Sequence, residues 1–132
     1  MKIVLDTNVL ISGLLSPNGK PAQILNLFLN GNIILLYDNR ILFDYIKVLH
    51  REKFGFKDEW INPFLDFLRS EGEYISAEPL NILFLDEDDK KFYEVALAGN
   101  ADYLITGNLR HFPNKATILS PGDFLSSALF KE

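Results

Sequence analysis

The sequence predicts an α/β fold, a three-layer α-β-α arrangement around a mainly parallel central sheet. Two observations lead to this prediction. Short apolar runs alternate along the chain with amphipathic helical patterns. The first run, KIVLD, places three large apolar residues directly before an acid, as in a strand that is buried in a parallel sheet. The 132 residues contain no repeat or break in composition, so we expect a single domain over 1–132.

The first half of the chain carries clear start and stop signals for its helices. Pro21 sits in the first turn of one helix and Gly31 is a plausible stop for it. Asp38 or Asn39 caps the next helix, because short polar side chains bond the free N–H groups of a first turn. The expected elements are a strand at 2–6, helices at 7–15 and 21–31, a strand at 32–37 and a helix at 38–54.

The second half continues the alternation. Pro63 must lie in the first turn of its helix or distort it. Asp86 caps a further helix that stops at Gly99 and Asn100, and Pro121 begins the last one. The expected elements are a helix at 58–72, a strand at 73–77, a helix at 86–100, a strand at 102–106, a loop at 106–115, a strand at 116–120 and a helix at 120–130.

The composition excludes several classes of protein. There is no cysteine, which rules out disulfides and thiolate metal sites. No apolar run reaches the roughly 18 residues that span a bilayer, and the N-terminus lacks a signal-peptide pattern, so we expect a cytoplasmic protein without a membrane partner. The net charge of −5 argues against a protein that coats DNA. It is compatible with a metal nuclease, which needs clustered carboxylates.

Three acids stand at positions where the fold class would gather them. Asp6 ends the first strand, at the sheet edge where such folds bind ligands, and an ionised carboxylate is costly to bury there without a partner. Asp44 lies within the apolar stripe of its helix, where an acid is unusual; alternatively it sits at the edge of the stripe and reaches water. Asp89 falls on the buried side of the helix at 86–100, and so does Asp86.

The acidic run DEDD at 86–89 is more than one helix cap requires. Four neighbouring acids repel one another, and a nearby cation relieves that repulsion. We expect Glu87 and Asp88 to face solvent. The other acids form an all-oxygen ligand set, which suits Mg²⁺ or Mn²⁺ and hydrolysis at phosphorus. With only His50 and His111 available, a zinc site is poorly supported.

Four segments, in order and over nearly the whole chain, resemble a PIN domain. They are IVLDTNVLISGLL, ILFDYIKVLHREKF, DDKKFYEVALAGNADYLITGN and ILSPGDFL. More narrowly, the chain resembles the PIN-type toxin components of bacterial and archaeal toxin–antitoxin pairs. The resemblance implies a PIN-like fold and a metal-dependent ribonuclease, with acidic residues around one or two Mg²⁺ or Mn²⁺ ions.

Individual residues match the motifs of that family. Asp6 matches its first acid, and Thr7 and Asn8 match the small polar residues that follow, with Asn8 orienting the site by hydrogen bonding. Asp89 matches the acid at the start of the helix before the A-D-Y segment. Thr106 matches the polar residue that ends the next strand. The resemblance therefore implies catalytic and metal-binding roles for Asp6, Asp44 and Asp89, with supporting roles for Thr7, Asn8, Asp86, Thr106 and Asn108.

Two positions depart from the family pattern. Asp44 stands where the family usually has Glu, and we expect its shorter side chain to reach a metal only through water. Asn108 and His111 occupy the region of the usual fourth acid. Asn108 offers a carbonyl oxygen without charge. His111 is able to contact phosphate or move a proton; alternatively it is a loop histidine without a special role.

Substrate and partners are expected from the remaining motifs. Arg40, Arg110 and His111 are candidates for binding single-stranded or looped RNA, although basic side chains often only form a solvated face. The other basic candidates are Lys47, His50, Arg51, Lys53 and Lys115. The aromatic residues of 54–67 are expected in the core, or in part against a second subunit or an antitoxin. A homodimer and a cognate antitoxin protein are the expected protein partners.

Two alternatives to a ribonuclease toxin remain. Asn108 and the short Asp44 are also what a catalytically weakened PIN-like module that binds RNA or protein would show. A small-molecule phosphohydrolase with an Asp nucleophile would carry a second Asp two residues after Asp6. Asn8 stands there instead, so this reading ranks last.

Overall fold

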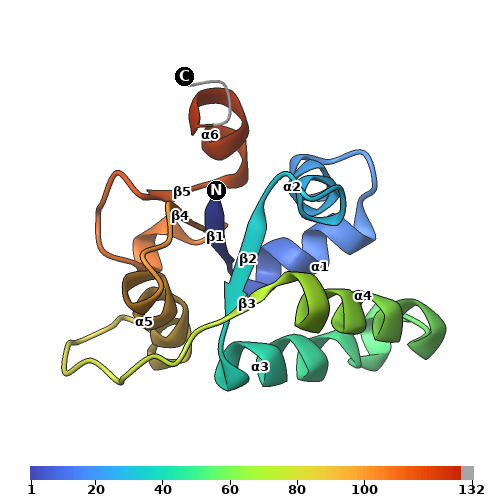
Figure 1. Cartoon of the computed structure of the whole chain (residues 1–132), viewed down its shortest axis with the longest axis horizontal. Helices are drawn as coiled ribbons and strands as arrows, with labels where there is room; N and C mark the ends of the chain where they lie inside the picture. The colour runs from blue at the N-terminus through green and yellow to red at the C-terminus, as the bar shows by residue number, and fades with distance from the viewer. Residues whose placement is uncertain (129–132) are drawn as a thin grey trace.

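The computed structural model describes residues 1–128 and contains a five-stranded sheet in the order β3-β2-β1-β4-β5 (Figure 1). All the pairings are parallel, which confirms the predicted α/β class. The strands are β1 (Lys2–Leu5), β2 (Ile34–Tyr37), β3 (Glu73–Tyr74), β4 (Tyr103–Ile105) and β5 (Ile118–Leu119).

Helices flank the sheet on both sides and complete the three layers. The helices are α1 (Thr7–Leu15), α2 (Lys20–Leu29), α3 (Asn39–Leu49), α4 (Asp58–Glu71), α5 (Lys90–Ala98) and α6 (Pro121–Asp123). Helix α5 packs against β1, β2 and β4, and α4 packs against β2 and β3. In Figure 1, α5 lies to the left of the central strands, whereas α1, α2 and α4 lie to the right.

The register of the central strands brings two polar residues together. Leu5 of β1 is paired with Ile105 of β4, and the Asp6 N–H donates to the Ile105 carbonyl over 3.0 Å. Because the two strands are parallel and end at the same level, the next residues, Asp6 and Thr106, leave the sheet side by side. The apolar residues of β1 are fully buried, so the carboxyl end of this strand is anchored in the core.

The helix expected over 38–54 is shorter than predicted. Helix α3 ends at Leu49, Arg51 is extended, and a separate 3₁₀ turn covers Glu52–Phe54. Gly55 then adopts a left-handed φ of 67°, which favours glycine and ends the turn. The prediction was wrong beyond Leu49, because the extended backbone at Arg51 breaks the continuous helical pattern.

The helix expected from Asp86 also begins later than predicted. Residues Glu87–Asp89 form a 3₁₀ turn, and the α-helix starts at Lys90. The Asp86 carboxylate accepts from the Asp88 N–H over 3.0 Å and so caps the 3₁₀ turn rather than the α-helix.

Other boundaries differ at the margins of the sheet. The strand expected at 73–77 is reduced to Glu73–Tyr74 and the one at 116–120 to Ile118–Leu119, because both lie at sheet edges with a single neighbour. Pro63 lies inside α4, beyond its first turn. The last helix is α6 followed by a π-helical turn at Phe124–Ala128. Residues 129–130 of the expected helix lie outside the described residues.

The aromatic stretch at 54–67 is only partly in the core. Phe64 and Phe67 contact the buried Phe28 edge to face, with centroid distances of 6.5 and 5.1 Å. Trp60 is 60% exposed, so the core expectation was wrong for this residue, whose ring instead lies beside Lys57 Nζ, 5.3 Å from the ring centroid. Over residues 1–128, none of the helices combines the length and apolar character needed to cross a membrane.

Candidate active site

The first predicted acid, Asp6, lies at the carboxyl edge of the sheet and is 2% exposed. Two donors hold its carboxylate. The Thr106 hydroxyl donates to Oδ2 over 2.7 Å, and the Asn8 backbone N–H donates to Oδ1 over 3.3 Å. Thr106 is itself fully buried. Adjacent parallel strands thus place the acid beside its donor, at the edge where this fold class binds ligands.

Asp44 reaches the same edge from α3. The Tyr45 hydroxyl donates to the Leu5 carbonyl and fixes α3 against the end of β1. The neighbouring Asp44 carboxylate accepts from the Thr7 hydroxyl, and its Oδ1 lies 3.7 Å from Lys91 Nζ. Its side chain is 23% exposed. Asp44 is therefore a partly buried, partnered acid rather than one that only reaches into water.

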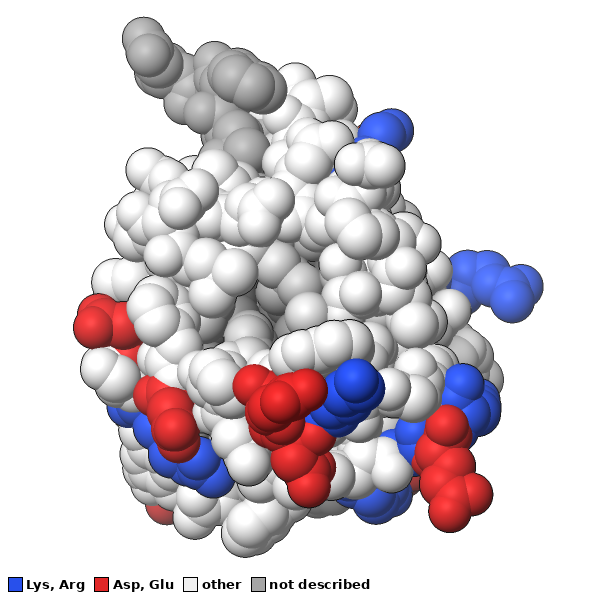
Figure 2. Space-filling view, turned by 90° about the vertical axis from the view of Figure 1, so that its right-hand side faces the viewer, with Lys and Arg blue, Asp and Glu red and all other residues white. Residues whose placement is uncertain are grey.

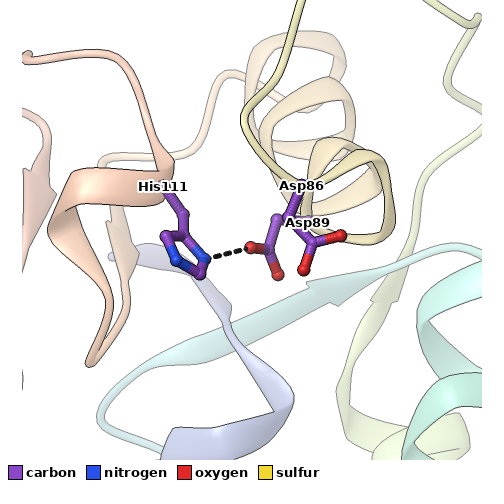
Figure 3. A group of neighbouring side chains, drawn as sticks. All are labelled: Asp86, Asp89 and His111. Atoms are coloured by element: carbon purple, nitrogen blue, oxygen red, sulfur yellow. Dashed lines mark hydrogen bonds and ion pairs between the residues drawn. The ribbon is translucent and has the colours of Figure 1, made fainter.

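A third group joins two separate segments of the chain. Asp86 and Asp89 lie at the two ends of the 3₁₀ turn before α5, and His111 lies at the end of a second 3₁₀ turn, Leu109–His111. Figure 3 shows the His111 ring directed toward the Asp89 carboxylate, and His111 Nδ1 lies 2.8 Å from Asp89 Oδ2. One ligand atom from each of the three residues lies within 4.8 Å of the others. As expected, Glu87 and Asp88 are exposed. The expectation that Asp86 lies on the buried side was wrong: it is exposed, because it precedes the 3₁₀ turn in an extended conformation, whereas Asp89 is partly buried.

The carboxylates are close enough to influence one another. Burial raises the pKa of Asp6 above its ordinary value of 3.8. The hydrogen bonds from Thr106 and Asn8 oppose this shift, and the negative charges of Asp89 and Asp44 add to it. The pKa of Tyr45 is also raised well above its ordinary value, by burial and by the charges of Asp6 and Asp44. The edge thus concentrates negative charge where little water is available.

The donor set at this edge fits a divalent cation. The charges of Asp89 and Asp44 act on the Asp6 carboxylate, and among the described residues the group whose ligand atoms all lie within 4.8 Å of one another is Asp86, Asp89 and His111, without Asp6 or Asp44. Mutually repelling, desolvated carboxylates are stabilised when a hard cation neutralises them.

Both predicted asparagines support the site through their backbone. The Asn8 N–H holds Asp6, as described, and the Asn108 N–H donates to Thr106 Oγ1 over 3.0 Å. The Asn8 side chain is exposed. The expected hydrogen-bonding role of Asn8 is thus met by its N–H, which any residue except proline would supply.

Arg40, predicted for substrate binding, is an exposed residue that forms ion pairs with two buried acids. Arg40 Nη1 lies 2.6 Å from Glu94 Oε1, and Nε lies 2.8 Å from Asp38 Oδ2. Desolvation lowers the pKa of Arg40, but the hydrogen bonds to Glu94 and Asp38 outweigh it and raise the pKa overall. Glu94 is 3% exposed and also accepts from the Leu80 N–H. It was not identified from the sequence, because the residue three positions before it is Lys91, whereas the residue three positions before Asp44 is apolar.

Several other basic candidates have partners outside the acidic edge. His50 Nε2 lies 3.2 Å from Asp58 Oδ1, and Lys115 Nζ lies over the Tyr93 ring at 5.2 Å. Figure 2 shows the face that lies on the right of Figure 1, where acidic and basic side chains are interspersed along the lower part and no continuous positive band forms. Arg110, next to His111, is exposed and remains a candidate for phosphate contact.

Two comparisons with known proteins show what the chain is similar to. A family model described as "PIN domain" matches residues 2–110, which include Asp6, Asp44, Asp86 and Asp89 and end one residue before His111. The chain is also similar to the uncharacterized protein MJ1680 of Methanocaldococcus jannaschii. The two are 34% identical over 112 residues, which cover 82% of this chain and 71% of that protein.

Proposed function

The chain belongs to the PIN domain family, whose members are generally nucleases, and from this premise we propose that it is a divalent-metal-dependent endoribonuclease. The observation that carries the proposal is the meeting of Asp6, Asp44 and Asp89 at one sheet edge. They come from three different elements, and the charges of Asp89 and Asp44 raise the pKa of the buried Asp6. Such a cluster is costly for stability alone and useful for holding Mg²⁺ or Mn²⁺.

The residues at the edge would divide the work between holding and positioning. Asp6 and Asp89 would hold the ion directly, and Asp44, with its shorter side chain, would act through water. The bound ion would neutralise charge at the scissile phosphate and activate water. Thr106 fixes the Asp6 carboxylate, and Thr7 fixes that of Asp44, so that neither has to reorganise during the reaction.

RNA is the proposed substrate because the surroundings of the edge suit a flexible strand. Arg110 lines an open hollow of about 370 Å³ together with Asn108 and His111. A basic side chain beside an acidic site can position a phosphate without reading sequence. Single-stranded or looped RNA would enter such an open hollow more readily than a duplex.

The resemblance to PIN-type toxins supports a narrower proposal, that the chain is the toxin of a toxin–antitoxin pair. A cognate antitoxin protein, and a second copy of the chain in a homodimer, are the proposed protein partners. Co-expression with the product of the neighbouring reading frame should relieve growth arrest and yield a stable complex. Growth unaffected by the chain alone would contradict the toxin role without touching the nuclease.

One observation favours a second candidate function, a PIN-like module that binds RNA or protein without cleaving it. Asp44 already accepts from Thr7 and lies 3.7 Å from Lys91 Nζ, and Asn108 brings no charge. If these partners withdraw Asp44 from the metal, the remaining acids would support binding better than turnover.

Cleavage of a mixed-sequence RNA decides between the two candidates. Purified protein is incubated with Mn²⁺ or Mg²⁺, or with chelator, alongside Asp6→Asn and a matched control, Asp66→Asn. Asp66 is an exposed acid on α4. Cleavage that needs the ion, survives in the control and is lost in Asp6→Asn supports the nuclease. RNA binding without turnover in folded protein would favour the binding module.

A further inference from the structure

We infer that His111 is a metal ligand and that, with Asp86 and Asp89, it makes this site select divalent transition ions such as Mn²⁺ and Ni²⁺ over Mg²⁺. The inference rests on the proposed function, because it concerns the ion of the same site. It adds a nitrogen donor to what was predicted as an all-oxygen ligand set, and it takes in Asp86, which the sequence placed only in a supporting role.

The local backbone brings the two acids onto the same side. A 3₁₀ helix has about three residues per turn, so side chains three positions apart are eclipsed. Asp86 and Asp89 are separated by three positions across the 3₁₀ turn Glu87–Asp89. Asp86 itself is the extended residue before this turn and Asp89 ends it, and Figure 3 shows the two side chains next to each other.

An aromatic cluster holds His111 against the two acids. Phe112 is buried, and its ring meets Phe84 edge to face, with a centroid distance of 5.8 Å. Phe84 also contacts Tyr93 of α5 at 5.6 Å. These contacts fasten the residue after His111 to the segment just before Asp86 and to the helix that follows Asp89. The three ligand atoms are thus preorganised by packing outside the cluster itself.

The spacing matches what one ion can bridge. The ligand atoms of Asp86, Asp89 and His111 lie within 4.8 Å of one another. Two bonds of about 2.0–2.2 Å place ligand atoms at most about 4.4 Å apart across one ion, so this group would close on an ion with small side-chain movements. Asp86 uses Oδ1 for the Asp88 N–H, and the described residues give its Oδ2 no hydrogen-bond donor, which leaves that oxygen for a ligand.

The donor chemistry sets the preference among ions. Mg²⁺ favours oxygen ligands and water, whereas imidazole nitrogen is a common ligand of the first-row transition ions, whose affinities rise from Mn²⁺ towards Ni²⁺. The loop at 106–115 contains no acid and offers this site the neutral Asn108 and the nitrogen donor His111. A nitrogen donor in the ligand set favours the transition ions over Mg²⁺.

The competing explanation is an ion pair alone, in which protonated His111 donates to Asp89 and no ion binds between them. The two explanations differ in what His111 does when metal is added. A nitrogen that binds the ion must be unprotonated, so metal binding would release any proton on it to solvent, whereas a merely paired histidine keeps its contact with Asp89.

The first test measures metal affinity directly, in tag-free protein so that no added histidines compete. Calorimetric titrations with Mg²⁺, Mn²⁺ and Ni²⁺ compare the native chain with His111→Ala and His111→Asp. We expect His111→Ala to lower Ni²⁺ affinity by at least about tenfold and Mg²⁺ affinity far less. His111→Asp should narrow the ratio of Ni²⁺ to Mg²⁺ affinity. The chain's other histidine gives the control, and His50→Ala should leave all three affinities unchanged.

The second test needs no variant at the site and so does not depend on whether His111→Ala folds. In ¹⁵N-labelled native protein, adding Zn²⁺ should shift the ring-nitrogen signals of His111 and leave those of His50 in place; the His50→Ala variant assigns them.

Unshifted His111 signals, or equal Ni²⁺ affinity with and without His111, would overturn the inference and leave the ion pair alone. Loss of RNA cleavage in Asp6→Asn together with unchanged metal preference in His111→Ala would overturn this inference while sparing the nuclease. Metal binding through His111 without any RNA cleavage would support this inference and contradict the nuclease.

Discussion

The Thr106 hydroxyl donates to the buried Asp6 carboxylate over 2.7 Å while accepting from the Asn108 N–H over 3.0 Å. The hydroxyl therefore has its donor and acceptor roles fixed by its two neighbours. This relay ties Asp6, the residue after β1, to the loop that follows β4, and through that loop to His111. It also lowers the pKa of Asp6 against the effect of burial.

Thr106→Val tests the relay with a side chain of similar shape. Losing the hydroxyl leaves the Asn108 N–H without its acceptor and should lower the free energy of unfolding by about 1–3 kcal/mol. The pKa of Asp6 should rise further, so the acid limb of the pH–rate profile should move to higher pH. Urea unfolding and the pH dependence of cleavage measure the two effects. Thr117→Val, at an exposed threonine, is the control and should change neither.

Asp6→Asn should stabilise the metal-free protein at neutral pH. The folded-state pKa of Asp6 lies above the ordinary value of 3.8, chiefly because of burial. The folded state therefore holds this proton more tightly than the unfolded state does. The proton on Asp6 therefore adds to the free energy of unfolding. This contribution is complete below the ordinary pKa and is lost as the pH rises through the pKa of the folded state.

The measurement is the difference in the free energy of unfolding between native protein and Asp6→Asn, taken with chelator across mildly acidic to neutral pH. The advantage of the variant should grow as the pH rises, by about 1.4 kcal/mol for each unit by which folding raises the pKa. Asp66→Asn should show no such trend. A difference that stays constant with pH would mean that Asp6 is not ionised unfavourably in the fold.

The edge that carries Asp6 and Thr106 was predictable because its signals are local. Continuous apolar runs identified β1 and β4, and parallel strands in an α/β fold present their carboxyl ends together. Asp44 stood out as an acid among apolar neighbours on one helix face. The pairing of Leu5 with Ile105, which makes the contact between Asp6 and Thr106 specific, appeared only in the structure.

The features of the fold and the site that were not predicted depend on contacts between distant segments, which the periodicity of the sequence does not encode. Glu94, for example, binds Arg40, which lies 54 positions earlier in the sequence. The packing of Phe84 on Phe112 likewise joins two irregular segments. The start of α5 at Lys90 was missed because Asp86 caps a 3₁₀ turn, and Asp is equally suited to capping either kind of helix.

Glu94→Ala should destabilise the protein by about 2 kcal/mol, because it leaves the Leu80 N–H without an acceptor and removes one partner of Arg40. The loss should fall short of that for a fully buried ion pair, since the Arg40 side chain is 40% exposed and stays hydrated. Glu94→Gln keeps an acceptor for Leu80 and should lose less. Chemical denaturation gives the values, with exposed Glu71→Ala as the control. Equal losses in the two Glu94 variants would assign the whole effect to charge.

Divalent ions should stabilise the folded chain, because the acids converge only there. At a free Mn²⁺ concentration about a hundred times its Kd, the gain should be about 2.7 kcal/mol, and thermal melting should report it. Chelator should remove the gain. In Asp89→Asn the gain should shrink strongly, whereas Asp66→Asn should keep it. A melting temperature that does not respond to Mn²⁺ in native protein would contradict a metal site at this edge.

The most direct test of the nuclease is the rate at which a single labelled RNA is cleaved with Mn²⁺ by native protein, Asp6→Asn and Asp66→Asn. Asp6 lies at the centre of the converging acids, and its neutral replacement keeps the shape of the side chain. The predicted result is a rate that falls by on the order of a hundredfold or more in Asp6→Asn and is unchanged in Asp66→Asn. Cleavage at the native rate by Asp6→Asn would contradict a metal-dependent active site at the end of β1.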